Sequence, residues 1–330
     1  MNEASNKKGK RLTVQQVSMI SRLAVLLVIL CFGIFIDKSF ISFRNISNNL
    51  ANASILIVLG IGQTVAIITN GPDLSASSVM TICAVVAAIL MKSMGVPFVI
   101  AILAAVLLGG LLGALNGYMI AYVGIPSFVA TYGLQWAVFG FAYVILNGYV
   151  LYGFEDSFRF IGNGTLFGFL QMPIVIMIIF VILGTLLLKK TNFGRMCFSV
   201  GSNQEAAVMS GINSKTVIVK AFVLSGVLSA LAGILFVSRM NAVQSDIGNA
   251  YLLPVLATVY MGGTSALGGE GSIFGTVIGA LVITVVTNCL NLLSVPSEWR
   301  DAIIGLLIIV TVLADIMLKQ RVTNRKKASA

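Results

Sequence analysis

The chain has 330 residues, of which 58% are hydrophobic and only 10% are charged, and its formal net charge is +10. A typical soluble domain has about 25% charged residues and a smaller apolar fraction, so this composition excludes a water-soluble globule. Soluble enzymes, nucleic-acid-binding proteins and disulfide-rich secreted proteins are therefore excluded as descriptions of the whole chain. At about 20 apolar residues per transmembrane helix, the chain has room for roughly nine or ten spans and for no large soluble domain.

The basic residues are concentrated in or beside three polar segments, residues 1–19, 190–216 and 319–330. In polytopic proteins the loops that carry most of the Lys and Arg face the cytoplasm. If all three segments are cytoplasmic, the number of spans is even on each side of the middle loop and both termini are inside. The basic residues concerned are Lys7, Lys8, Lys10, Arg11, Arg22, Lys189, Lys190, Arg195, Lys215, Lys220, Lys319, Arg321, Arg325, Lys326 and Lys327.

The apolar runs, taken in chain order, predict an all-α polytopic membrane protein with about ten transmembrane helices between residues 20 and 318. The run at 251–263 is too short to cross a bilayer of about 30 Å at about 1.5 Å per residue, so it is a half-helix or it takes length from 245–250. The spans are expected at 20–37, 46–69, 75–93, 97–123, 126–147, 169–189, 217–238, 251–263, 272–293 and 299–318.

Small residues recur every four positions on several of these helices, so that each set lies on one helix face. In lipid, helices associate through close backbone approach, which small side chains permit. We expect these faces to contact neighbouring helices, either within one subunit or between two subunits. The sets are Gly109, Gly113 and Gly117, then Ser225, Ser229 and Gly233, and finally Gly275 and Gly279.

A first polar break, residues 70–75, separates two apolar runs. Gly71 and Pro72 interrupt the helix. Asp73 is a carboxylate, which costs about 2.5–3.5 kcal/mol at the centre of a membrane helix and so needs a water-filled cavity, a partner or an interfacial position. Asp73 or Ser75 either caps the following helix or lines a substrate path.

A second break, residues 262–272, is rich in glycine and predicts a sharply turning or closely packed backbone. It is not a phosphate-binding loop, because no lysine follows the glycines as a Walker motif requires. Paired helix interruptions in the two halves of a transporter often mark its substrate path. The glycines expected to act as hinges or half-helix ends are Gly71, Gly262, Gly263, Gly268, Gly269 and Gly271.

The middle loop contains a helix signal at 202–210. Ser202 and Glu205 have the spacing of an S-x-x-E capping box, and Gly211 is a typical helix-ending residue. An isolated helix of about two turns is not stable in water, so another surface must pack on it, either a partner protein or the lipid headgroups.

Four sequence stretches together resemble the permease subunits of carbohydrate ABC importers of the ribose type. GPDLSASSV at 71–79 is similar to the family's GGIDLSVGS stretch, with Pro72 and Ser77 as departures. GSNQEAAVMSGI at 201–212 resembles its cytoplasmic loop, and CLNLLSV at 289–295 resembles its N-x-LNLL-x-V segment. The most specific match is GGTSALGGEGSIFGTVIGA, because many glycines at fixed offsets rarely coincide by chance.

The resemblance implies a multi-pass permease of the bacterial inner or plasma membrane, paired as a homodimer or with a sister permease. It would receive a sugar from an extracytoplasmic binding protein. ATP and Mg²⁺ would bind a separate cytoplasmic ATPase, since this chain has no Walker lysine and no LSGGQ-like signature. We therefore expect no catalytic residue, no metal site and no cofactor in this chain.

Two sets of site residues follow from the resemblance. The helix at 202–210 would dock in a cleft of the ATPase, with Ala206 and Ala207 small because that contact is close. The coupling residues are Ser202, Asn203, Glu205, Ala206, Ala207 and Gly211. The candidate residues of the substrate path are Asn70, Asp73, Ser75, Asn288 and Asn291.

Other functions remain as alternatives. A related permease would carry a branched-chain amino acid, a nucleoside or another small polar metabolite. An ion-coupled secondary transporter would need intramembrane carboxylates or histidines, and this chain has no histidine and few acids near its apolar runs. A membrane enzyme would need a catalytic cluster of such residues, which the spans lack.

Overall fold

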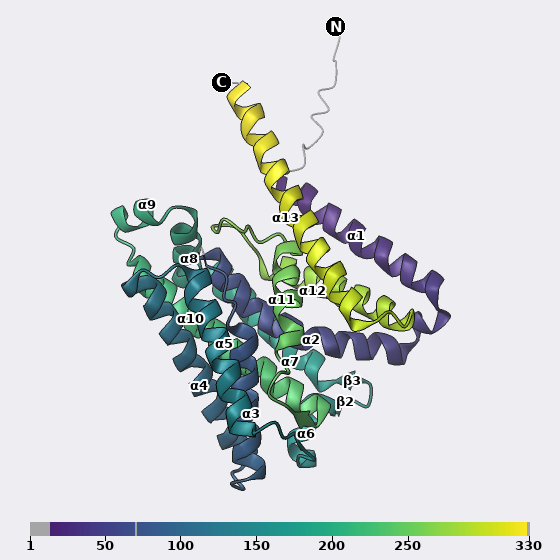
Figure 1. Cartoon of the computed structure of the whole chain (residues 1–330). Helices are drawn as coiled ribbons and strands as arrows, with labels where there is room; N and C mark the ends of the chain where they lie inside the picture. The colour runs from purple at the N-terminus through teal and green to yellow at the C-terminus, as the bar shows by residue number, and fades with distance from the viewer. Residues whose placement is uncertain (1–13, 70, 329–330) are drawn as a thin grey trace.

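The computed structural model describes residues 14–69 and 71–328, and this part of the chain is mostly helical (Figure 1). A helix covers most of each predicted apolar run, so the prediction of a mostly helical membrane protein is confirmed, whereas the number of ten spans stays a prediction. These helices are α1 (Val14–Ile36), α2 (Phe43–Ile68), α3 (Ala76–Lys92), α4 (Phe98–Tyr118), α5 (Ser127–Leu146), α7 (Met172–Lys190), α10 (Ser214–Met240), α11 (Asn249–Met261), α12 (Ile273–Leu292) and α13 (Ser297–Ala328).

Shorter elements lie between these helices, and four of them are two-residue strands in loops, which leave the fold all-α as predicted. Strand β1 pairs antiparallel with β4, and β2 pairs antiparallel with β3, because loop backbone groups at one end of the bundle satisfy one another. The shorter elements are η1 (Lys38–Ile41), η2 (Met119–Val123, a π-helical turn), α6 (Asp156–Asn163), α8 (Asn192–Ser202), α9 (Gln204–Met209), β1 (Leu151–Tyr152), β2 (Thr165–Leu166), β3 (Leu170–Gln171) and β4 (Ala242–Val243).

Six of the described helices are long and apolar enough to cross a membrane, and they differ in how deeply they are buried. The most apolar window of α2 is 94% buried inside the chain, whereas those of α4 with η2 and of α7 are only 22% and 28% buried. Helix α2 is therefore the central helix, and α4 and α7 present apolar surface outward. Helix α11 has 13 residues, about 20 Å, which confirms that it is shorter than a full span.

Local sequence signals set the ends of the central helices. The Ser42 hydroxyl accepts a hydrogen bond from the Asn45 N–H at 3.3 Å and begins α2. Helix α2 ends just before Gly71 and Pro72, as the first break predicts. The Ser272 hydroxyl accepts from the Gly275 N–H at 3.0 Å and begins α12 directly after the second break.

The small-residue faces pack within the chain, which confirms one of the two alternatives left by the sequence. A side chain at Gly113 would overlap the carbonyl oxygen of Phe222 on α10, and one at Gly117 would lie 2.6 Å from the Cα atom of Val219. Gly233 similarly abuts the backbone of α3. Gly275 packs directly on the Gly262 backbone at the end of α11. Helices α4 and α10, and helices α11 and α12, are thus joined at backbone distance.

The two ends of the bundle carry different elements (Figure 1). Helix α9 and the C-terminal end of α13 lie at one end, and α6 and the β2–β3 hairpin lie at the other. Helix α13 continues through most of the segment that the sequence assigned to a C-terminal tail, up to Ala328. Lys and Arg are good helix formers, which explains why this basic segment continues the helix.

Candidate coupling and substrate-path sites

Helix α9 is capped at both ends by its own sequence, but the N-cap is not the predicted residue. Asn203 has extended backbone angles (φ −161°, ψ 106°), and its Oδ1 atom accepts from the Ala206 N–H at 2.9 Å. Ser202 instead forms the last residue of α8, so its hydroxyl is not in position to cap α9. The predicted capping box is therefore wrong. Glu205 lies in the first turn of α9, where a negative charge is favoured by the helix dipole.

The C-terminal end of α9 agrees with the sequence. Gly211 has a left-handed backbone (φ +81°), and the Ile212 N–H returns to the Ala207 carbonyl oxygen at 3.0 Å. This is the arrangement expected of a glycine just beyond a helix end. The prediction that Gly211 ends the helix is confirmed.

The two alanines of α9 lie in different surroundings. Ala207 is only 4% exposed and belongs to the hydrophobic core of the chain itself, whereas Ala206 is exposed. The expectation that both are small because of a partner contact is thus wrong for Ala207, whose size is set by packing inside the permease. The outward residues are Val208 and Met209, which are 52% and 90% exposed.

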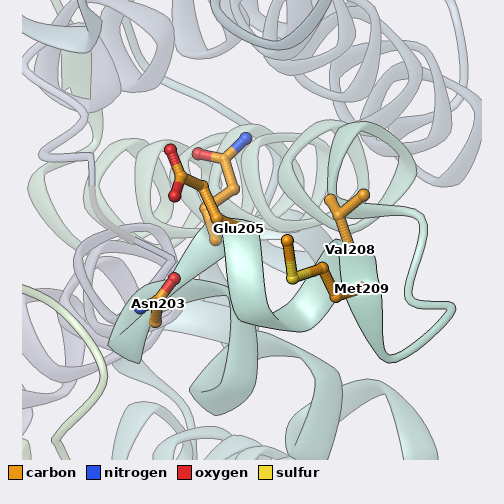
Figure 2. A pocket seen from close by; sticks show the side chains of 5 residues that line it. Asn203, Glu205, Val208 and Met209 are labelled. Atoms are coloured by element: carbon orange, nitrogen blue, oxygen red, sulfur yellow. The ribbon is translucent and has the colours of Figure 1, made fainter.

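The outer side of α9 has a concavity, which is lined by Asn203, Gln204, Glu205, Val208 and Met209. Figure 2 shows Val208 and Met209 toward one end of the helix and Asn203 and Glu205 toward the other. The surface combines an exposed apolar pair with an acidic group and amide groups. Such a mixture suits contact with a polar, partly apolar protein cleft better than contact with lipid tails.

Helix α8, which leads into α9, is anchored in the chain by a buried cysteine. Cys197 belongs to the hydrophobic core, and burial raises the pKa of its thiol to about 12. The thiol therefore stays protonated and behaves as a small apolar side chain. All four cysteines are unpaired.

The first break is held by a buried polar cluster around Asp73. The Asp73 Oδ1 atom accepts from the Ser75 N–H at 3.1 Å and from the Ser75 hydroxyl at 2.6 Å. Its Oδ2 atom accepts from the Ser225 hydroxyl of α10 at 2.7 Å. Asp73, Ser75 and Ser225 are each no more than 2% exposed. The carboxylate therefore holds the start of α3 against α10 and faces no open space.

Two amides complete this cluster. The Gln63 amide of α2, oriented to satisfy both partners, donates to the Asp73 carbonyl oxygen at 3.0 Å and accepts from the Asp73 N–H at 3.1 Å. The Asn116 amide of α4 donates to the Ser75 hydroxyl at 2.7 Å. Both amides are fully buried. Helices α2, α4 and α10 thus all bind the break through single polar side chains.

Sequence reasoning found Asp73 and Ser75 but missed Gln63, Asn116 and Ser225 as their partners. The available signal was the presence of isolated amides, Gln63 and Asn116, in apolar stretches of α2 and α4. A buried polar group in a membrane helix needs a hydrogen-bond partner. The sequence does not say which partner, because the five residues come from three helices and a break, and α4 and α10 are far from the break in the chain.

The remaining path candidates lie elsewhere. Asn70 lies outside the described residues. Asn288 exchanges amide hydrogen bonds with Asn45 at 3.1 and 3.2 Å, and the exposed Asn291 accepts from the Arg300 guanidinium at 3.0 Å. Asn291 is near the end of α12, about 27 Å along the helix from its start beside the second break. The structure does not bring these asparagines together with Asp73 and Ser75 into one site.

The second break has the sharply turning backbone that its glycines predict. Gly263, Gly268 and Gly269 have φ values of +77°, +78° and +71°, a region that glycine adopts without strain. The Gly268 N–H donates to the Ser265 carbonyl oxygen at 3.1 Å, which closes a compact turn. Gly262, in contrast, has a helical backbone and is small because α12 approaches it closely.

Comparison with known proteins decides the family. A family described as "Branched-chain amino acid transport system / permease component" matches residues 45–312. The chain belongs to this permease family. All four motif stretches fall within the matched range, so the resemblance seen in the sequence is confirmed. A permease component moves solute across a membrane, and this chain is accordingly a transport subunit and not an enzyme.

Curated relatives match almost the whole chain. A ribose import permease of Haemophilus influenzae is 36% identical over 318 residues, which are 95% of this chain and 97% of that protein. A D-allose transport system permease of Escherichia coli is 30% identical, over 97% of this chain and 98% of that protein. A galactose/methyl galactoside import permease of Salmonella typhimurium is 33% identical, over 88% and 92%. No solved structure matches the chain.

Proposed function

We propose that this chain is the membrane-spanning permease of an ATP-driven importer for a simple sugar, a ribose-like pentose or a hexose. The observation that carries this proposal is the nearly full-length identity of 30–36% to permeases named for ribose, allose and galactose. Solute selectivity of a permease comes from the groups that line its path. A match that extends along all the helices therefore supports the same class of solute.

A branched-chain amino acid is the second candidate, because the description of the matching family names it. The two candidates are separated by uptake in cells that lack their own sugar and leucine importers and express this permease with its neighbouring transport components. We expect labelled pentose or hexose to accumulate and excess unlabelled leucine not to compete. Leucine uptake at the expense of sugar uptake would favour the second candidate.

The proposed topology has ten spans, with α9 and both termini in the cytoplasm and α6 outside the cell. Support comes from the basic residues around α8 and α9, at Lys189, Lys190, Arg195, Lys215 and Lys220, together with the position of α6 at the opposite end of the bundle (Figure 1). The positive-inside rule assigns the basic end to the cytoplasm. This orientation fits the inner or plasma membrane of a bacterium.

The energy source is proposed to be a cytoplasmic ATPase that binds Mg-ATP, with no cofactor bound by the permease. The docking surface is α9, supported by its two caps, its exposed Val208 and Met209 side chains and its acidic first turn. A helix of six residues keeps its shape only when both ends are capped and one side is packed. Helix α9 meets both conditions, and its outward side is available for a partner.

The other proposed partners are an extracytoplasmic sugar-binding protein at the α6 end, the lipid bilayer, and a second permease, either a copy of this chain or a sister chain. The outward apolar surface of α4 and α7 supports contact with lipid or with another membrane protein. The sugar path is proposed to run beside the two breaks. Asp73 and Ser75 would hold the first break in place without contacting the sugar, because they are buried among other helices.

A further inference from the structure

The two breaks and the α8–α9 segment meet at one point, although they are far apart in the sequence. Ile68 is the last residue of α2, two residues before the first break described above. Its carbonyl oxygen accepts a hydrogen bond from the N–H of Gly269, in the second break, at 2.9 Å. The second break therefore satisfies one of the carbonyl groups that a helix end leaves without an internal partner.

Helix α8 packs on the same pair of residues. Gly201 is buried in the last turn of α8, and a Cβ atom there would overlap the Ile68 carbonyl oxygen and lie 2.7 Å from the Gly269 nitrogen. A Cβ atom at Gly269 would in turn lie 2.5 Å from the Ser202 hydroxyl oxygen. Three backbone segments thus touch with no side chain between them. We call Ile68, Gly201, Ser202 and Gly269 the backbone junction.

The junction is joined to α9 without a flexible loop. Asn203 is the single residue between the two helices, and it is the C-cap of α8 and the N-cap of α9. On the other side, Gly262 at the end of α11 packs on the backbone of Gly275 in α12. A displacement of α9 therefore reaches Gly201 within one helical turn, and a displacement of Gly269 reaches both α11 and α12.

Resting on the proposed role of α9 as the ATPase-docking helix, we propose that the backbone junction relays movement between α9 and the two breaks. Backbone contacts of this kind transmit displacement because no rotamer change can absorb it. Gly201 and Gly269 are then positioning residues for transport. Glycine is needed at Gly201 because a larger side chain would not fit the contact. Conformational freedom is not the reason there, since Gly201 lies in an ordinary helical turn.

The test is Gly201→Ala, reconstituted with the ATPase and binding protein that co-purify with the wild-type permease. We expect the ATPase to stay bound and basal ATP hydrolysis to continue. Sugar uptake, and the stimulation of hydrolysis by sugar-loaded binding protein, should fall roughly 5- to 150-fold, the range for overpacking a fitted contact. If the junction is not a relay, uptake and stimulation will stay at the wild-type level.

Two control variants separate a relay from a general packing defect. Gly305→Ala adds a methyl group to a helical glycine where, among the described residues, no atom outside its own helical turn lies within 4 Å of the added carbon, and it should change nothing. Gly113→Ala adds one to an equally tight glycine outside the junction, at the Phe222 backbone, and should lower the amount of folded permease without separating hydrolysis from transport. A Gly201→Ala phenotype identical to that of Gly113→Ala would overturn the relay.

A second measurement uses the wild-type complex and so does not depend on a variant folding. Hydrogen exchange is followed by mass spectrometry with and without a non-hydrolysable ATP analogue. We expect peptides covering 199–209 and 262–271 to change together. A change at 199–209 with none at 262–271 would refute the relay while leaving α9 as the docking helix. If no ATPase co-purifies and ATP drives no uptake by the wild type, the proposed function itself fails instead.

Discussion

Replacing Asp73 by alanine is expected to lower the stability of the folded permease, because the Asp73 carboxylate holds helices together. The carboxylate accepts three hydrogen bonds, two from Ser75 and one from Ser225, at 2.6 to 3.1 Å. Removing the carboxylate leaves the Ser75 N–H and the Ser75 and Ser225 hydroxyls without this acceptor, and each buried donor left unsatisfied costs about 1–3 kcal/mol. Asp73→Ala should therefore lower the free energy of unfolding by about 3–5 kcal/mol.

Asp73→Asn should cost less, about 1–2 kcal/mol, because the amide oxygen keeps both contacts with Ser75 and the amide N–H can donate to the Ser225 hydroxyl, so that mainly the charge is lost. The assay is the fraction of monodisperse permease that survives heating in detergent, measured by fluorescence-detected gel filtration. Asn291→Ala is the control, since Asn291 is exposed and its loss should change stability by less than about 0.5 kcal/mol.

The expected order of midpoint temperatures is wild type and Asn291→Ala highest, Asp73→Asn intermediate and Asp73→Ala lowest. If Asp73→Ala were as stable as the wild type but no longer transported sugar, the reasoning would be wrong. The carboxylate would then act on the solute and not on the helix packing.

Three further predictions concern the cytoplasmic end and the topology. A cysteine placed at Asn203 should react with an impermeant maleimide only in inverted vesicles and one at Ser157 only in intact cells; any other pattern contradicts the proposed topology. Cys197 should resist maleimide at pH 8 in the native permease, because burial raises the pKa of its thiol to about 12; its labelling should rise about tenfold with each pH unit below that pKa, and sharply when the chain unfolds. Met209→Asp should weaken ATPase binding roughly 10- to 150-fold in a pull-down titration, the value of about 1.5–3 kcal/mol for one large apolar side chain, with permease levels unchanged because Met209 is exposed; unchanged binding would remove α9 from the docking surface.

The helices were predictable because hydropathy is a local property. Each apolar run became one helix, and the short run at 251–263 became the 13-residue helix α11. The glycine signals were equally local. The positive φ values of Gly211 and Gly269 follow from residue type and position. Such features depend on a few neighbouring residues, which the sequence displays directly.

The cluster around Asp73 was not predictable in the same way. Gln63 and Asn116 reach the first break only because particular faces of α2 and α4 turn toward it, and the pattern of one helix does not fix that rotation. The antiparallel pairing of β1 with β4 depends on contact between distant loops for the same reason.

The sequence also did not predict that Ala207 faces the hydrophobic core of the chain. Helix α9 begins one residue later than the S-x-x-E spacing indicates, because α8 extends through Ser202 and leaves Asn203 as the cap. The competition between two adjacent helices for one cap decides which side of α9 faces the core. Neither helix reveals this competition when its sequence is considered alone.

ATP-driven sugar import is tested most directly by transport with the purified permease, reconstituted in liposomes with its co-purifying ATPase and binding protein. The measurement is the accumulation of labelled pentose and hexose, with labelled leucine in parallel, in vesicles that have ATP on the cytoplasmic side of the permease. We expect sugar accumulation that requires both ATP and binding protein and is unaffected by collapsing proton and sodium gradients. Accumulation of leucine alone, or sugar uptake that follows an ion gradient without ATP, would contradict it.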